Sequence, residues 1–334
     1  MNDKILMEHG SGGRATDELI HEIFSRYFQN EVLSRMEDSA VVEAPTGRIA
    51  VTTDSFVVDP VEFPGGDIGR LCVCGTVNDL LMRGAMPKYL TCGFILQEGL
   101  KLDLLEKLVK SMAATAKEAG VMIVAGDTKV VEGHGGLMIN TAGVGILEDG
   151  LDISAYNAKP GDVILCSGNV GDHHAAILSS RMKIKNSIES DNAPLTMMVQ
   201  KLLEHRIPVH TLRDVTRGGL ATILKELALT SGQVFELKEE QIPVSAQVKD
   251  FAGLLGLDPL YMGNEGKMIV ILPEAYADEA LTLLKQSDYG QDACRIGTVM
   301  APEKDEAGSL ILRTRIGGKR MLTVLQGEGL PRIC

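Results

Sequence analysis

The sequence lacks any hydrophobic run near the roughly 18 residues that a membrane-spanning helix requires, which excludes such a helix. The opening segment MNDKILMEHGSGGR has no apolar core of signal-peptide length, which argues against export and favours a cytoplasmic protein. Positive charge is also scarce: 33 Lys and Arg stand against 45 Asp and Glu, giving a net charge of −12 with no basic patch. This balance argues against nucleic acid as the main partner.

Cysteine is too sparse for a disulfide scaffold, with only six in 334 residues. Four of them lie in apolar surroundings and a fifth opens a strand-like run, so we expect reduced, buried thiols: Cys72, Cys74, Cys92, Cys166 and Cys294. Cys334 differs because it is the last residue of the chain, on a tail where packing does not account for it.

The hydrophobic content is ample for a buried core, at 45% of the chain, and excludes global disorder. At roughly 150 residues per domain, the length predicts about two domains. The clearest helix is 102–119, with Gly120 placed to end it. We further expect helices at 71–83, 173–181, 194–205, 218–230 and 274–287, strands at 49–53, 89–96, 121–125, 137–146, 162–167, 233–237, 267–272, 295–299 and 309–314, and a hairpin over 309–325.

The predicted elements mix runs of strands with helices instead of alternating strictly, which favours an α+β protein. Segment 154–161 contains Lys159-Pro160-Gly161 and is typical of a linker or tight turn. We therefore expect two α+β domains with mixed sheets and flanking helices, and a boundary near residue 155.

Several carboxylates occur where predicted strands or helices end, beside glycine or small residues: Asp38, Asp54, Asp79, Asp127 and Asp214. Any single one is better explained as a solvated loop carboxylate, since the chain has acids to spare. Acids at strand ends can converge on one cleft, however, and Mg²⁺ prefers carboxylate oxygens together with water and phosphate oxygens. The set of five therefore predicts nucleotide phosphates held through magnesium.

The common nucleotide-binding motifs are absent: there is no Gly-x-x-x-x-Gly-Lys-Ser/Thr and no Gly-x-Gly-x-x-Gly that opens a helix after a strand. ATP would therefore need another architecture. The loop Gly10-Ser11-Gly12-Gly13 offers backbone N–H groups that can wrap phosphates. Alone this signal is weak, because glycine-rich termini are often without structure.

Five internal blocks resemble the superfamily of aminoimidazole ribonucleotide synthetase and selenophosphate synthetase. They are Glu37-Asp38-Ser-Ala-Val-Val, Thr52-Thr-Asp54, Gly75-Thr-Val-Asn-Asp79-Leu with Gly84-Ala-Met-Pro87, Ala125-Gly-Asp-Thr128 and Asp214-Val-Thr-Arg-Gly-Gly219. The start His9-Gly-Ser-Gly-Gly13 and the end Pro331-Arg-Ile-Cys334 resemble the HypE family of hydrogenase expression/formation proteins, which are carbamoyl dehydratases. The resemblance extends over essentially the whole chain.

The resemblance implies an ATP-binding and dimerisation domain over 1–155, an α+β domain over 156–325 and a flexible tail over 326–334 that carries the reactive cysteine. It implies a homodimer that uses ATP and Mg²⁺. In that family the terminal cysteine receives a carbamoyl group from the carbamoyltransferase HypF. The S-carboxamide is dehydrated to a thiocyanate, and the cyano group then passes to iron on the HypC–HypD complex.

On this chemistry, Cys334 carries the substrate, Lys129 supplies a cation beside the amide oxygen, and Glu265 accepts a proton. For Lys129 and Glu265, an ordinary surface charge remains the alternative. The predicted nucleotide contacts are Gly10, Ser11, Gly12, Gly13, Asp54, Asn78, Asp79, Asp127 and Thr128. The predicted metal ligands or their supports are Asp38, Asp54, Asp79, Asp127 and Asp214.

Two other functions fit parts of the sequence. A selenophosphate synthetase carries its reactive Cys or Sec near the N-terminus, whereas this chain has no cysteine before Cys72. A non-catalytic carrier whose tail thiol ferries a ligand needs no magnesium site, so the five acidic positions argue against it.

Overall fold

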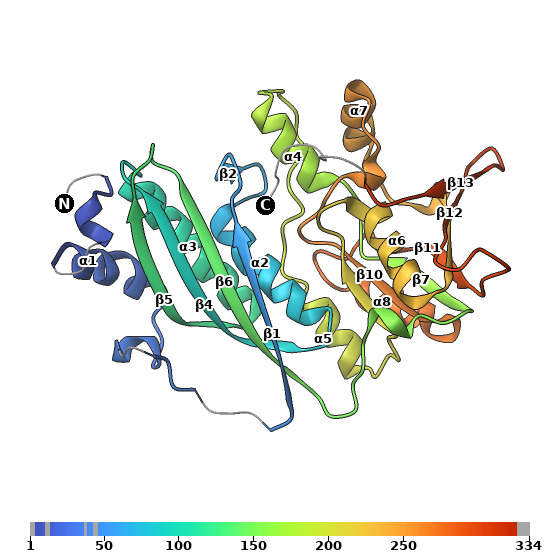
Figure 1. The fold of residues 1–334 in the computed structure, drawn as a ribbon, viewed down its shortest axis with the longest axis horizontal. Helices are drawn as coiled ribbons and strands as arrows, with labels where there is room; N and C mark the ends of the chain where they lie inside the picture. The colour runs from blue at the N-terminus through green and yellow to red at the C-terminus, as the bar shows by residue number, and fades with distance from the viewer. Residues whose placement is uncertain (1–3, 11–13, 37–38, 43–45, 326–334) are drawn as a thin grey trace.

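The computed structural model describes residues 4–10, 14–36, 39–42 and 46–325, which form two sheets with helices packed on them (Figure 1). The α+β class is confirmed. The first half contains η1 (Met7–Gly10), α1 (Arg14–Leu19), η2 (Ile20–Ser25), η3 (Leu33–Arg35), β1 (Arg48–Phe56), β2 (Glu62–Phe63), β3 (Gly66–Asp67), α2 (Ile68–Leu81), β4 (Met86–Gln97), α3 (Leu102–Ala119), β5 (Met122–Val131) and β6 (Leu137–Leu147).

The second half carries the larger sheet and five α-helices. Its elements are η4 (Ala155–Asn157), β7 (Asp162–Cys166), α4 (Asp172–Arg181), α5 (Thr196–Glu204), β8 (Thr211–Asp214), α6 (Gly219–Ser231), β9 (Val234–Lys238), η5 (Glu239–Gln241), α7 (Ala246–Leu255), η6 (Pro259–Tyr261), β10 (Met268–Pro273), η7 (Glu274–Tyr276), α8 (Ala277–Lys285), β11 (Cys294–Met300), β12 (Leu310–Arg313) and β13 (Lys319–Leu322).

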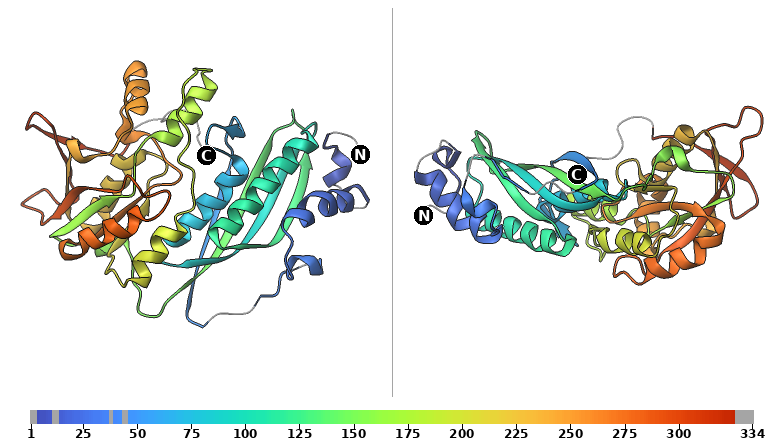
Figure 2. Two further views of the ribbon diagram at one scale, coloured as in Figure 1. Left: turned by 180° about the vertical axis from the view of Figure 1, so that it is seen from behind. Right: turned by 90° about the horizontal axis from the view of Figure 1, so that it is seen from below.

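The N-terminal sheet has the strand order β1-β6-β4-β5, with β4 and β5 parallel and the other pairs antiparallel. Helices α2 and α3 cover one of its faces (Figure 2). The predicted helix 102–119 is confirmed with the same bounds. It ends at Gly120, whose φ of 73° is a left-handed conformation that favours glycine.

The other face of this sheet carries no helix in the described part of the chain (Figure 2). Apolar side chains stand on it with large exposed fractions: 58% for Ile49, 67% for Val51, 41% for Ile95 and 38% for Val131. We call this surface the open face. An antiparallel sheet can leave one face toward water, but apolar side chains there are less usual than polar ones.

The C-terminal sheet has the order β13-β12-β9-β11-β7-β10-β8 and is antiparallel except for the β9–β12 pair. Its strand β7, between β11 and β10, is buried along its whole length. Side chains alternate between the two faces of a strand, so Val163 and Leu165 join one hydrophobic cluster while Ile164 and Cys166 join another. Helices on both faces explain why residues 163–166 of this strand are all apolar.

The two halves share one continuous core. The cluster that contains Leu71 of α2 and Leu105 of α3 also contains Leu165 of β7, Leu202 of α5 and Leu284 of α8. In Figure 1, α2 accordingly lies between the N-terminal sheet and α5. Residues that meet at this junction are therefore held by packing from both sides.

The sequence predicted most of the longer elements but missed several. Strand β8 (Thr211–Asp214) and helix α7 (Ala246–Leu255) were not expected. Strands β1 and β5 also extend beyond the predicted ends, so Asp54 and Asp127 lie inside strands and not after them, which corrects the prediction. Ladder pairing with β6 and β4 continues through both residues and keeps the backbone extended there. No helix in the described ranges is long and apolar enough to cross a membrane.

Candidate functional site at the domain junction

Four carboxylates approach one another where the two halves meet; we call them the acidic cluster. Asp54 comes from β1, Asp79 from α2, Asp214 from the end of β8 and Glu265 from the loop before β10. Asp54 faces α2, since a Cβ added at Gly75 would lie 3.6 Å from its Oδ2. The Thr52 hydroxyl donates a 2.9 Å hydrogen bond to Asp79. The junction thus gathers acids from both halves of the sequence.

Burial and mutual repulsion make these carboxylates hard to ionise. Burial, followed by the charge of Asp79, raises the pKa of Asp214 to about 6. Burial and then Asp79 also raise the pKa of Asp54. The pKa of Glu265 is raised well above its ordinary value by burial and then by Asp191, Asp214 and Asp54. A buried group of like charges is stabilised when a cation binds among them.

The carboxylates of the acidic cluster are the kind of ligand that Mg²⁺ prefers, but they do not by themselves supply a full set of ligands around one ion. Within the described ranges, no group of three or more His, Cys, Asp or Glu side chains is placed to hold a metal ion. The five aspartates therefore stay a prediction as metal ligands or their supports, and Asp38 lies outside the described residues. Mg²⁺ commonly takes only one or two carboxylates and completes its shell with water and phosphate oxygens, which Asp54, Asp79 and Asp214 can accommodate.

Asp127 and Lys129 lie elsewhere, on the open face. Asp127 aligns across the sheet with Gly93, Asn140 and Ser55, whereas Asp54 points to the opposite face because side chains alternate along β1. Three strand spacings, about 14 Å, separate their backbones. Lys129 Nζ pairs with Asp127 Oδ1 at 2.8 Å, and both side chains are more than half exposed. Within one chain Lys129 lies on the open face and Glu265 at the domain junction, so the catalytic roles of both residues stay predictions.

A cavity of about 350 Å³ lies beside β5 under the N-terminal helices, apart from the acidic cluster. Three predicted nucleotide contacts, Gly10, Asp127 and Thr128, line it together with Lys129. Its remaining wall is largely apolar and includes Phe94. A Cβ added at Gly10 would lie 2.5 Å from the Val130 nitrogen, so the close approach requires glycine. An apolar cavity with a few converging polar groups suits a purine base. Ser11, Gly12 and Gly13 lie outside the described residues.

Asn78 was predicted to contact nucleotide, but its amide is engaged by protein groups. Its Nδ2 donates to the carbonyl oxygen of Ala193 at 3.1 Å and to that of Glu265 at 3.4 Å. Its Oδ1 accepts from the Leu195 N–H at 2.9 Å. The residue is 3% exposed. Asn78 therefore joins α2 to two loops of the second half, and the interpretation as a nucleotide ligand is not supported.

The prediction of buried internal thiols is confirmed for four cysteines and nearly so for the fifth: Cys72, Cys74, Cys92 and Cys166 are buried and Cys294 is half-buried. Burial raises the pKa of Cys166 to about 12 and that of Cys294 to about 11. These thiols stay protonated near neutral pH and are poor nucleophiles. Cys334 lies outside the described residues. The described chain ends at Leu325, whose N–H donates to Thr222 Oγ1 at 3.1 Å.

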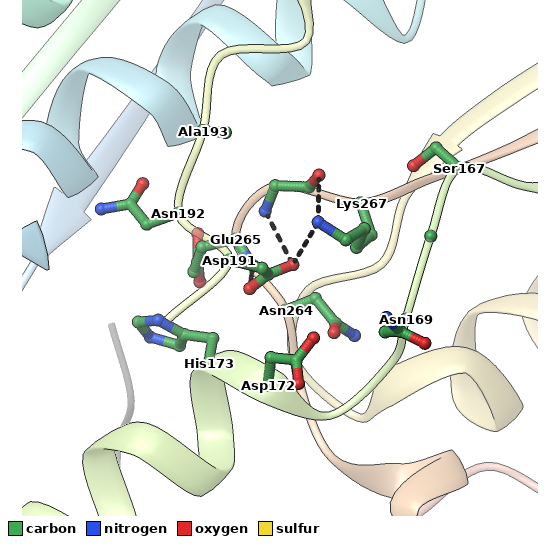
Figure 3. Close-up of polar contacts among 12 residues, drawn as sticks. Ser167, Asn169, Asp172, His173, Asp191, Asn192, Ala193, Asn264, Glu265 and Lys267 are labelled. Carbon is green, nitrogen blue, oxygen red and sulfur yellow. Dashed lines mark hydrogen bonds and ion pairs between the residues drawn. The ribbon is translucent and has the colours of Figure 1, made fainter. Parts of the chain in front are cut away.

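Sequence reasoning missed a set of polar residues around Glu265, which Figure 3 shows. Asp191, on the loop between α4 and α5, lies against Glu265 and Lys267 (Figure 3). Asp172, the first residue of α4, and Asp191 both line a cavity of about 480 Å³. No motif marks this loop, because its neighbours are far away in sequence and meet only in the fold. Asp191 thus extends the site beyond the acidic cluster, whereas Asp172 only lines the neighbouring cavity.

Asp172 provides a test of these electrostatics. Burial, followed by the charge of Asp191, raises its pKa to about 6. A carboxyl group whose pKa is raised by folding stabilises the fold while protonated, and that contribution is lost as pH rises through about 6. Asp172→Asn should therefore raise the free energy of unfolding at pH 8 by about 1–3 kcal/mol. Thermal unfolding of both proteins should show that this stability gain shrinks as pH falls from 8 to 4. A gain of equal size at pH 8 and at pH 4 would contradict the raised pKa of Asp172.

Comparison with known proteins decides the family. Residues 36–147 match the AIR synthase related protein, N-terminal domain, and residues 159–308 match its C-terminal domain. Carbamoyl dehydratase HypE of Azotobacter vinelandii is 48% identical over 338 residues, covering 100% of this chain and 98% of that protein. The chain belongs to the HypE family.

Solved structures of HypE agree with the fold described above. A crystal structure of hydrogenase maturation protein HypE in complex with ATP is 48% identical, with a TM-score of 0.94 over 98% of this chain and 99% of that one. A crystal structure of a HypE–HypF complex is 45% identical, with a TM-score of 0.79 over 92% of this chain and 99% of that one. The first relative binds ATP, and the second assembles with HypF.

Proposed function

We propose that this chain, like its HypE relatives, is an ATP-dependent carbamoyl dehydratase of hydrogenase maturation. It converts an S-carboxamide on Cys334 to a thiocyanate. One observation carries this proposal: Glu265 is 4% exposed beside three aspartates, yet its carboxylate makes no hydrogen bond to any described protein group. A buried acid with raised pKa and free oxygens is suited to accept a proton from a bound substrate.

The reaction removes one water from –S–C(=O)–NH₂. ATP transfers its terminal phosphoryl group to the amide oxygen, which converts oxide into phosphate, a better leaving group. Loss of the nitrogen protons and departure of phosphate then leave –S–C≡N, with ADP and phosphate as the other products. Phosphoryl transfer depends mainly on positioning and on neutralising charge. Glu265 accepts a nitrogen proton, and Lys129 stabilises the charge on the amide oxygen.

The nucleotide occupies the space between the two groups of residues described above. The apolar cavity beside Gly10 and Thr128 holds the base, and Asp127 lies at its rim. The ATP complex of the HypE relative supports ATP as the nucleotide. Mg²⁺, held by Asp54, Asp79 or Asp214 together with phosphate oxygens, would supply charge neutralisation.

A homodimer would bring the separated groups together. The open face exposes apolar side chains, whose burial against a second copy would be favourable. It also carries Lys129 and Asp127 on the outer strand β5. Asp54 lies on the opposite outer strand, β1. Pairing of two open faces would bury the apolar patch and place β5 of one copy beside β1 of the other. In this arrangement each site uses Lys129 of one copy and Glu265 of its partner.

The relatives suggest the other partners. The HypE–HypF complex supports HypF as the carbamoyl donor for this chain as well. The HypC–HypD complex is the acceptor of the cyano group, in keeping with the maturation role. The overall proposal is tested by following the mass of the Cys334 peptide with and without ATP.

Subunit mixing tests the shared site. Lys129→Met and Glu265→Gln proteins should each be inactive alone. Random exchange gives half mixed dimers, each with one intact site of two, so a mixture should recover about a quarter of wild-type thiocyanate formation. The matched control mixes Glu265→Gln with the double variant Lys129→Met/Glu265→Gln, which should recover nothing. Mixed dimers that are seen by native mass spectrometry but remain inactive would show that the two residues do not complete one site across the dimer.

A further inference from the structure

Asp191 contacts three consecutive residues of the loop that carries Glu265. Its Oδ1 accepts the main-chain N–H of Glu265 at 3.0 Å, and its Oδ2 accepts that of Gly266 at 3.3 Å. Oδ2 also lies 3.6 Å from Lys267 Nζ. The Asp191 side chain is 3% exposed. A buried carboxylate that accepts two adjacent N–H groups fixes the direction of that peptide segment.

The two loops approach so closely that little movement is possible. A Cβ added at Gly266 would lie 1.9 Å from the Asp191 carbonyl oxygen. The Ala193 N–H donates to the Glu265 carbonyl oxygen at 3.4 Å, and Ser190 N–H donates to the Pro64 carbonyl oxygen at 2.8 Å. The loop that carries Asp191 is thus anchored to the first half of the chain, and through Asp191 it holds the Glu265 backbone.

The contrast between backbone and side chain at Glu265 is informative. Its N–H and C=O are both bonded, whereas its carboxylate has no hydrogen-bond partner within the described ranges. No hydrogen bond from a described side chain therefore orients this carboxylate, and its position depends more strongly on the backbone. Displacement of a reacting group by about 1 Å can cost about 100-fold in rate.

We propose that Asp191 is a positioning residue for Glu265: its carboxylate clamps the Glu265–Gly266 peptide and so directs the Glu265 carboxylate at the bound S-carboxamide. This inference rests on the proposed role of Glu265 as proton acceptor. Asp191 itself need not touch the substrate. Asp191 does not line the cavity beside Gly10, so ATP affinity should not depend on Asp191.

Asp191→Asn is the informative substitution because it keeps the shape. Its Oδ1 can still accept the Glu265 N–H, but its amide nitrogen cannot accept the Gly266 N–H and no longer attracts Lys267. The turn then loses one of its two anchoring bonds. We expect single-turnover conversion of preformed S-carboxamide to slow by about 10–100-fold, with the affinity for Mg-ATP unchanged.

The experiment compares full-length dimers of Asp191→Asn, Glu265→Gln and the double variant, with Asp172→Asn as control. Asp172 lines the same cavity but bonds to Ser245 and not to the Glu265 loop. Each protein is carbamoylated on Cys334, given ATP, and followed by mass spectrometry of the terminal peptide. ATP affinity is measured in parallel, and Asp191→Glu tests rescue by the longer carboxylate.

The double variant separates a positioning role from a general loss of structure. If Asp191 acts through Glu265, the double variant is no slower than Glu265→Gln alone. Asp172→Asn keeps the wild-type rate, and Asp191→Glu recovers part of it. A wild-type rate for Asp191→Asn, or additive losses in the double variant, would overturn the proposal. A wild-type rate for Glu265→Gln would instead overturn the proposed function of Glu265.

Discussion

Cys334→Ala is expected to form no thiocyanate while its fold and ATP affinity stay close to wild type. The substrate is built on the Cys334 sulfur, so the variant has no atom to carry the carbamoyl group. The last residues of a domain usually contribute little to its core, so we expect only a small change in stability. Carbamoylation assays with HypF, thermal unfolding and ATP titration measure the three properties.

The matched control for this result is Cys294→Ser. Cys294 is the one described cysteine that is not fully buried, and its Sγ lies 3.5 Å from the Gln241 carbonyl oxygen. Burial raises its pKa to about 11, so it should not react. The variant should accept the carbamoyl group as the wild type does. Thiocyanate formation by Cys334→Ala, or its loss in Cys294→Ser, would show that the reactive thiol is not that of Cys334.

Glu265→Gln is expected to accumulate the S-carboxamide on Cys334. The amide keeps the size of the side chain but cannot accept a proton, and positioned general bases contribute about 10²–10⁴-fold. Carbamoylation by HypF precedes this step and should proceed normally. Mg-ATP should still bind, because Asp54, Asp79 and Asp214 are unchanged in this variant. Rapid quenching followed by mass spectrometry of the terminal peptide measures the stalled intermediate.

Conversion by Glu265→Gln at the wild-type rate would contradict this role. Glu265 would then be a buried structural carboxylate. Asp172→Asn again provides the control, since it removes a carboxylate of raised pKa from the neighbouring cavity without touching the Glu265 loop. A comparable loss of rate in both variants would point to a general change in the electrostatics of the junction.

Local sequence patterns predicted the regular elements well. The periodic apolar positions of α3 and the glycine at its end gave its bounds correctly, because an amphipathic helix on a sheet is specified by its own residues. The hairpin of β12 and β13 was likewise expected from Gly317-Gly318. Helix α7 was missed, although Ser245 caps it by accepting the Val248 N–H.

The arrangement of the site depended on contacts that no local pattern contains. The acidic positions were recognised, but which of them meet is decided by strand alternation and by the packing of α2 against the second half. Asp54 and Asp127 look alike in sequence and point to opposite faces of one sheet. Asp191 has no motif, and its role emerges only where its loop meets Gly266. Asn78 was misread because its partners, Ala193 and Glu265, are more than a hundred residues away.

The central claim is that this protein dehydrates an S-carboxamide on its own last residue with ATP. The most direct measurement is a time course of the Cys334 peptide mass after carbamoylation by HypF, with ATP and with a non-hydrolysable ATP analogue. The account predicts that ATP converts the carbamoylated peptide into one lighter by a single water, with one ADP formed per peptide, and that the analogue leaves it unchanged. Loss of water without ATP hydrolysis, or ATP hydrolysis that leaves the carbamoylated peptide intact, would contradict it.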